Sequence, residues 1–188
     1  EKLKQISIPF VLSTIKLEEE DGRQEYASIS VDDIKESERI VEYLLQNGHR
    51  KIAVIGSRKD DESIGWLRLQ GYRRALERYH VAVDEELICY VPGNLAAYSM
   101  EAGYEMTDQL LKKGKAFTAL FAMSDSMAVG ACKAILDHGG SIPDQYSVVG
   151  FDGMDVAQYY NPSITTIRQP VEEMAEATIR MLLELIRK

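Results

Sequence analysis

Cysteine and histidine are scarce in this chain, and their spacing gives no sign of a metal site. The 188 residues include two cysteines and three histidines. Cys89 and Cys132 lie far apart and form no C-x-x-C pair, and the histidines are scattered at positions 49, 80 and 138. Zinc sites need closely spaced ligands, so we expect no metal. We expect both cysteines to be reduced core residues of a cytosolic protein, although the sequence leaves a bridge between them open.

Long hydrophobic runs and common enzyme motifs are also missing. No apolar run approaches the ~20 residues of a membrane-spanning helix, and residues 1–6 lack the apolar core of a secretory signal. The chain contains no G-x-S-x-G elbow, no G-x-x-x-x-G-K-S/T phosphate loop and no G-x-G-x-x-G turn. We therefore expect a cytoplasmic protein that is not an enzyme and binds no cofactor.

Positive charge is too sparse for this chain to hold DNA by itself. Its net charge is −8, whereas a grip on a phosphate backbone needs clustered lysine and arginine. The two most basic clusters are Arg73, Arg74 and Arg78, and Lys112, Lys113 and Lys115. Cations are common at helix C-termini and on solvated faces, so we interpret both clusters as structural.

A strand, a polar turn and a helix are clearly recognisable between residues 117 and 136. Residues 118–122 are apolar, which is typical of a strand buried on both faces of a parallel sheet. Ser124 and Asp125 follow, and either side chain can cap a helix; we interpret Asp125 mainly as this cap. Ligands of open α/β sheets bind outside the carboxyl ends of the strands, so this turn is a candidate site.

The same alternation runs through most of the chain. Apolar runs that predict buried strands lie at 52–55, 87–91, 118–122 and 147–151. Other pieces are expected as strands at 8–12 and 26–31, an irregular stretch at 153–162 and an extended segment at 164–169. Repeated strand and helix units predict an α/β fold with doubly wound parallel sheets. The four buried strands would bring their polar carboxyl ends together as one pocket.

Two longer segments carry a resemblance to a known family. Residues 48–56 read GHRKIAVIG, and residues 147–170 read SVVGFDGMDVAQYYNPSITTIRQP. With FTALFAMSDSMAVGA between them, the chain resembles the effector-binding part of a LacI/GalR-type bacterial transcriptional repressor. The resemblance implies a periplasmic-binding-protein-like fold of type I, in which two similar lobes clamp a ligand.

The resemblance also implies how the chain divides. Residues 1–50 would be a partial first lobe, residues 51–168 the second lobe, and residues 169–188 a helix returning to the first. The DNA-reading helix-turn-helix and the first strand and helix units of the family have no counterpart here. We therefore interpret the sequence as a fragment, whose open sheet edge needs a covering partner.

Four pocket residues carry over from the family. Arg68, in WLRLQGY, matches an arginine that binds effector hydroxyls or carboxylates, and Asp152, in GFDG, matches an aspartate on the facing side. The alternative for Asp152 is a helix cap or a salt bridge to Arg68. Ser124 matches a small polar position, and Tyr98 matches an aromatic that stacks on the effector, although Leu95 could take that place.

Two further positions have open roles. Trp66 is either a second stacking face or a packing residue at a helix start. Thr14 stands where relatives often have a pocket aspartate, which suggests a different effector pattern.

The resemblance places a dimer interface on the helix 127–136, including Met127, and on residues 155–160. Tyr159 and Tyr160 are candidates there, because tyrosines in a surface stretch are typical of interfaces. A core role for one of them is the alternative.

The function implied is that of a ligand-sensing domain of a repressor. A small molecule, namely a sugar, a sugar phosphate or a purine, would control operator DNA binding through the missing N-terminal domain of a homodimer. The alternative is an extracytoplasmic sugar-binding receptor of a transporter, which would use the same fold. Neither reading involves a membrane-bound segment of this chain.

Overall fold

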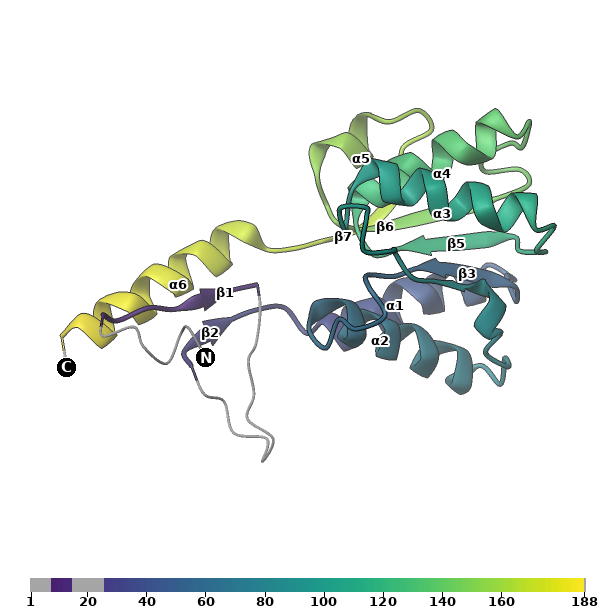
Figure 1. Ribbon diagram of the computed structural model, residues 1–188. Helices are drawn as coiled ribbons and strands as arrows, with labels where there is room; N and C mark the ends of the chain where they lie inside the picture. The colour runs from purple at the N-terminus through teal and green to yellow at the C-terminus, as the bar shows by residue number, and fades with distance from the viewer. Residues whose placement is uncertain (1–7, 15–25, 188) are drawn as a thin grey trace. The chain divides into compact units, whose positions relative to one another are not determined.

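The computed structural model describes residues 8–14 and 26–187, which form two compact units (Figure 1). The smaller unit comprises residues 1–32 and 170–188, and the larger unit comprises residues 33–169. The sequence-based boundary at residue 50 therefore lies too late. Residues 33–50 group with the larger unit because the helix they contain packs along the next helix of that unit. At the other end, the two units divide between Gln169 and Pro170.

The smaller unit contains two short strands and one long helix. Strand β1 (Leu12–Ser13) pairs in parallel with β2 (Ser28–Ile29). The strand predicted at 8–12 therefore shares only Leu12 with β1, which ends one residue later, and the strand predicted at 26–31 is shortened to β2. Helix α6 (Val171–Ile186) packs against both. One side of α6 buries Met174, while its exposed large apolar residues are Val171, Ile179, Leu183 and Ile186.

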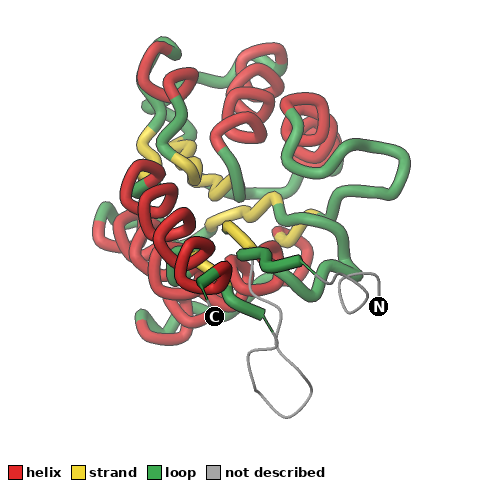
Figure 2. Tube along the Cα trace, turned by 90° about the vertical axis from the view of Figure 1, so that its left-hand side faces the viewer, coloured by secondary structure: helices red, strands yellow, loops and turns green. Residues whose placement is uncertain are grey.

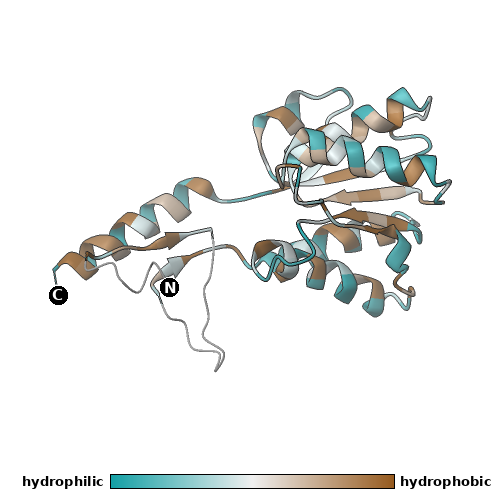
Figure 3. Cartoon of the chain, in the orientation of Figure 1, coloured by the Kyte–Doolittle hydropathy of each residue, from teal (hydrophilic) through white to brown (hydrophobic). Residues whose placement is uncertain are grey.

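A five-stranded parallel sheet forms the centre of the larger unit. Its strand order is β4-β3-β5-β6-β7. The strands are β3 (Ile52–Ile55), β4 (Ile88–Cys89), β5 (Ala119–Ala122), β6 (Ser147–Asp152) and β7 (Thr165–Arg168). Every residue of β3 and β5 is buried, as expected for strands covered on both faces. Figure 3 shows these strands as hydrophobic between helices with hydrophilic outer faces.

Helices cover both faces of this sheet (Figures 1 and 2). One face carries α1 (Asp33–Gln46) and α2 (Ile64–Arg78), and the other carries α3 (Met100–Lys112) and α4 (Asp125–Asp137). The members of each pair pack against each other. This arrangement is the predicted doubly wound α/β fold.

Three predicted segments differ in detail. The predicted strand 87–91 is reduced to β4, because Glu85–Leu87 forms a short 3-10 helix whose start is capped by Asp84. The stretch 153–162, expected to be irregular, contains the short helix α5 (Asp155–Tyr159). The extended segment 164–169 contributes the edge strand β7, which pairs in parallel with β6. Within the described part of the chain, no helix has the length and apolar character needed to cross a bilayer.

Candidate functional site

Arg68 lies at the centre of a buried polar cluster at the carboxyl ends of β5 and β6. It projects from α2, and only 5% of its surface is exposed. Its Nε donates to Asp33 Oδ1 over 2.9 Å, and its Nη1 donates to the carbonyl oxygen of Met123. The same Nη1 lies 3.6 Å from Asp152 Oδ1. The guanidinium carbon also sits 3.6 Å from the centre of the Phe151 ring.

These contacts explain how a charged side chain is accommodated in the interior. A buried guanidinium loses its hydration, and the loss is offset only when its donors are bonded and its charge is compensated. Asp33 supplies a buried opposite charge, and the Phe151 ring adds a cation–π contact. The planar group is therefore held in one orientation.

Asp152 ends β6 and faces Arg68. Its backbone has a φ of 119°, a region that favours glycine, so surrounding contacts must hold it there. Gln169 provides two of them: its Nε2 donates to Asp152 Oδ1 over 2.7 Å, and its backbone N–H donates to the Asp152 carbonyl over 3.0 Å. Burial raises the pKa of Asp152, although Arg68 and the Gln169 bond oppose this shift.

Gly153 completes this turn. It has a φ of 76°, and a Cβ at this position would collide with the backbone and side chain of Arg168. Only glycine avoids both problems, so the Asp152-Gly153 pair is tied to close packing between β6 and β7.

Asp125 has a different role from the one predicted. The N-cap of α4 is Ser124, whose side chain accepts from Met127 N over 3.2 Å, so the interpretation of Asp125 as the cap is wrong. The fully buried Asp125 instead accepts from Met154 N and from Thr166 Oγ1, each over 2.6 Å. Burial raises its pKa. Asp125 thus anchors the chain that follows Asp152.

Ser124 and Tyr98 are linked to each other through the loop before α3. The hydroxyl of Ser124, which is 4% exposed, donates to the carbonyl of Tyr98 over 3.3 Å as well as capping α4. Its hydrogen-bonding capacity is therefore largely used within the fold.

The Tyr98 hydroxyl is held by Asp61. It donates to Asp61 Oδ2 over 3.2 Å, and burial raises the pKa of Tyr98 to about 12. Asp61 Oδ1 accepts from the backbone N–H and the hydroxyl of Ser63. These bonds fasten the loop after β3 to the loop after β4, which fixes the rim beside the Arg68 cluster.

The structure brings some predicted residues together and separates others. Arg68 and Asp152 form the predicted pair, in the ion-paired arrangement given as the alternative for Asp152. Trp66 is 49% exposed near the start of α2, which leaves its ring available. Thr14 belongs to the smaller unit. Sequence reasoning missed Asp33, the Met123 carbonyl and Gln169.

The residues predicted for the dimer interface differ in how exposed their side chains are. Met127 is fully buried between α4 and α3, so it is excluded from any surface and its prediction as an interface residue is wrong. Tyr159 is 79% exposed, and Leu136, within the predicted helix surface, is 46% exposed. Tyr160 is half-buried, and burial raises the pKa of its hydroxyl.

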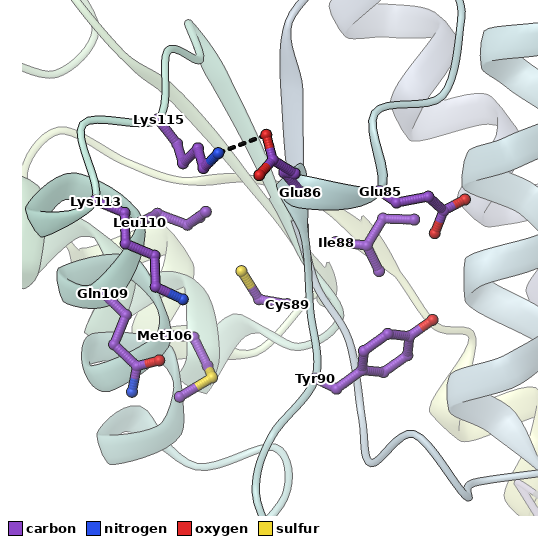
Figure 4. A pocket seen from close by; sticks show the side chains of 10 residues that line it. All are labelled: Glu85, Glu86, Ile88, Cys89, Tyr90, Met106, Gln109, Leu110, Lys113 and Lys115. Carbon is purple, nitrogen blue, oxygen red and sulfur yellow. Dashed lines mark ion pairs between the residues drawn. The ribbon is translucent and has the colours of Figure 1, made fainter.

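A separate groove of about 720 Å³ lies along the edge strand β4 and helix α3 (Figure 4). Its lining includes Ile88, Cys89 and Met106, and the ion pair between Lys115 and Glu86 crosses it. Cys89 and Cys132 are both free thiols. Burial raises the pKa of Cys89 to about 11, so this thiol stays protonated near neutral pH and is a poor nucleophile.

Comparison with known proteins places this geometry in a family context. The family model described as a periplasmic binding protein-like domain matches residues 41–188. The HTH-type transcriptional regulator MalR of Clostridium butyricum is 39% identical over 186 residues, which cover 99% of this chain and 54% of that protein. The chain spans about half the length of the curated relatives it matches.

Solved structures give the same picture. A sugar-binding LacI-family regulator from Escherichia coli, complexed with phosphate, is similar with a TM-score of 0.82 and 30% identity, covering 98% of this chain and 63% of that one. A LacI-family regulator from Enterococcus faecium with bound ribose has a TM-score of 0.79 and 28% identity, covering 95% and 62%.

Proposed function

Because the chain belongs to the periplasmic-binding-protein-like domain family, in the form carried by LacI-family regulators, we propose that it senses a small-molecule effector for a transcriptional repressor. Its curated relatives are transcriptional regulators rather than enzymes. They favour a sensor over a transport receptor with the same fold. Operator DNA would be bound by a helix-turn-helix segment outside these 188 residues.

The observation that carries this proposal is the placement of Arg68 and Asp152 at the carboxyl ends of adjacent strands. A guanidinium only donates hydrogen bonds and a carboxylate only accepts them, so neighbouring hydroxyls of one ligand can bond to both. Ligands of open parallel sheets bind at this end of the strands. The pair is therefore the effector-binding centre of the proposed sensor.

The ligands bound to solved relatives suggest which classes of small molecule this chain senses. One solved relative holds ribose and another holds phosphate, so a sugar and a sugar derivative are both candidates for this chain. The effector would shift the full protein between operator-bound and released states. A homodimer would use the surface around Tyr159 and Leu136, which expose large apolar side chains.

Calorimetric titration of the full-length protein with sugars and purines tests this function. Asp152→Asn removes the acceptor charge and Arg68→Lys removes the fork of donors, so we expect either change to weaken an effector by about tenfold or more. The exposed residues Asp144 and Arg74 provide matched controls, Asp144→Asn and Arg74→Lys. Equal affinity in all four variants would contradict the proposed centre, and absence of binding to wild type would contradict the proposed sensor.

A further inference from the structure

The edge strand β4 has backbone hydrogen-bonding groups that the sheet does not use. The Cys89 carbonyl accepts from Gly56 N over 2.8 Å, so the backbone groups of Cys89 face β3. Successive residues of a strand direct their backbone groups to opposite sides, so those of Ile88 and Tyr90 face away from β3. The Ile88 N–H donates to the Glu85 carbonyl. Among the described residues, the Ile88 carbonyl and both backbone groups of Tyr90 therefore have no partner.

The groove beside β4 has an apolar floor on one face of this strand. Cys89 projects toward α3, where the buried side chains of Met106 and Leu110 line the groove (Figure 4). Ile88 and Tyr90 project to the other side of the strand (Figure 4). Residues directly opposite each other on adjacent strands project to the same face. A strand added to this edge would therefore place the side chain opposite Cys89 over the apolar floor.

The acidic side chains that line the groove are already paired. Glu85 accepts two hydrogen bonds from Arg73, over 2.6 and 2.9 Å. Glu86 lies 2.5 Å from Lys115 Nζ. Each carboxylate thus has a cation of its own, so neither is free to neutralise another positive charge at this groove.

Lys113 supplies the charge that remains. It is an exposed lining residue, and within the described part of the chain no carboxylate pairs with its ammonium. Figure 4 shows its side chain pointing from the end of α3 toward Cys89. An acidic side chain on an added strand, opposite Cys89 or next to it on the same face, can pair with this ammonium. The groove therefore complements an acidic segment.

We propose that the β4 edge binds an extended acidic segment of a partner protein by strand addition. The backbone of this segment bonds to Ile88 and Tyr90. On the face toward α3, its apolar side chains cover Met106 and a carboxylate pairs with Lys113. In this mode of recognition the backbone bonds supply affinity and the side-chain contacts supply specificity. The surface is separate from the proposed effector centre, so the proposal does not depend on which effector is sensed.

A second copy of this chain fits the same edge less well. Two β4 strands that pair antiparallel about a twofold axis would place both α3 helices on one face of the joined sheet. Their two Lys113 side chains would then approach the same seam, while Glu85 and Glu86 already have partners. Like charges that face each other destabilise a strand pair. Charge complementarity therefore favours an acidic partner over a second copy.

Fluorescein-labelled peptides test the proposal on the full-length protein by fluorescence anisotropy. The acidic probe has the sequence TVTETVT, in which the valines and the glutamate share one face of a strand. Replacing the glutamate by lysine gives the basic probe TVTKTVT. Methylating the backbone nitrogens of the three central residues of the acidic probe removes its donors in either strand direction and keeps its side chains.

We expect the acidic probe to bind wild type about fivefold or more tightly than the basic probe. The methylated probe should bind about tenfold or more weakly than the acidic probe, because it cannot donate to the Ile88 and Tyr90 carbonyls. Equal affinity for all three probes would overturn the proposal. Failure of the acidic probe to bind at ~1 mM would overturn it as well.

Two pairs of variants separate the backbone contribution from the charge. Tyr90→Pro removes one edge donor, and proline is tolerated on an edge strand where its missing N–H faces outward; Tyr90→Phe keeps this N–H and loses only the hydroxyl. Tyr90→Pro should weaken the acidic probe about fivefold, and Tyr90→Phe should not. Lys113→Gln should abolish the preference for the acidic probe. Lys112→Gln should retain it, because Lys112 pairs with Asp108 and does not line the groove.

The variants also identify the results that would contradict the proposal. Undiminished binding to folded Tyr90→Pro protein, or an undiminished preference in Lys113→Gln, would overturn it; the methylated probe makes the backbone test if Tyr90→Pro does not fold. Sedimentation velocity tests the other occupant. Self-association that Tyr90→Pro abolishes and Tyr90→Phe retains would assign the β4 edge to a second copy and refute the acidic partner.

Discussion

Gln169 Nε2 donates a 2.7 Å hydrogen bond to Asp152 Oδ1, and the backbone N–H of Gln169 donates to the Asp152 carbonyl. Gln169 is the last residue of the larger unit, and Pro170 begins the return of the chain to the smaller unit. A residue of the proposed effector centre is thus bonded directly to a segment that joins the two units.

Gln169→Glu should weaken effector binding by about tenfold, because it replaces a donor beside Asp152 with a second carboxylate. The added negative charge should also raise the pKa of Asp152, so as the pH falls the variant should lose its remaining affinity at a higher pH than wild type does, because a protonated Asp152 is no longer a charged acceptor. Titration calorimetry at several pH values measures both effects. Gln109→Glu makes the same change at an exposed position of α3 and should leave affinity unaltered. Equal weakening by both variants would show that Gln169 has no local role.

His49 should make the free energy of unfolding fall at acidic pH. Its Nδ1 lies 2.9 Å from Thr118 Oγ1 and its Nε2 lies 3.1 Å from Ser147 Oγ, where burial lowers its pKa from the ordinary value of 6.5. The unfolded chain therefore takes up a proton first as pH falls through 6.5, which destabilises the folded state until folded His49 also protonates.

Urea unfolding of His49→Gln at pH values on both sides of this window checks the prediction. The variant should lose part of the pH dependence of the wild type. His80→Asn is the control, because asparagine tolerates the φ of 54° at that exposed position. If the free energy of unfolding depends on pH in the same way for wild type and His49→Gln, the prediction is wrong.

Gly130→Ala should destabilise the larger unit by about 3 kcal/mol or more, even though alanine favours helices by ~1 kcal/mol over glycine. A Cβ on Gly130 of α4 would overlap the Met100 carbonyl of α3, so the two helices could not keep their spacing. Urea denaturation measures the change. Gly93→Ala is the control, since nothing lies within 4 Å of its added Cβ. A loss of less than ~1 kcal/mol in Gly130→Ala would mean that the helices adjust freely.

Ser37→Ala should leave the free energy of unfolding unchanged or raise it by up to ~1 kcal/mol. Ser37 is fully buried in α1, and its hydroxyl has no hydrogen-bond partner within the described part of the chain. Removing an unsatisfied buried hydroxyl removes its desolvation cost. Thr107→Val is the contrasting variant, because buried Thr107 donates to the Gly103 carbonyl over 2.8 Å. We expect Thr107→Val to be destabilising; a destabilised Ser37→Ala protein would point to a bond that Ser37 makes.

The fold could be predicted where the sequence pattern is local. The strand at 52–55 was predicted with its observed bounds, because an entirely apolar run lies between Lys51 and Gly56. Strand β4 could not be predicted at its true length, because the apolar, buried residues Leu87 and Val91 flank it without belonging to it, and Leu87 forms part of a short 3-10 helix. The residues at 33–50 were assigned to the wrong unit because helix periodicity does not reveal which neighbour a helix covers.

Only some residues of the candidate site could be predicted from the sequence. Arg68 and Asp152 were predicted from the family resemblance, and the structure places Arg68 Nη1 3.6 Å from Asp152 Oδ1. Asp33 lies 35 residues from its partner Arg68, and Gln169 lies 17 residues from Asp152. Neither spacing belongs to a local motif, and an aspartate at a helix start is common for capping alone. These contacts depend on the tertiary fold.

Asp33 accepts a hydrogen bond from Arg68, and Gln169 donates one to Asp152; Arg68 and Asp152 are the two residues of the proposed effector centre. Asp33 and Gln169 are also the first and last residues of the larger unit. Both places where the backbone enters and leaves this unit are therefore fastened from inside it. For protein engineering, residues 33–169 are therefore a segment that could be moved as one piece, with a hydrogen bond to the effector centre at its first and at its last residue. If this segment were inserted into a fluorescent reporter protein, ligand binding at Arg68 and Asp152 should change the conformation at both points where the segment joins the reporter.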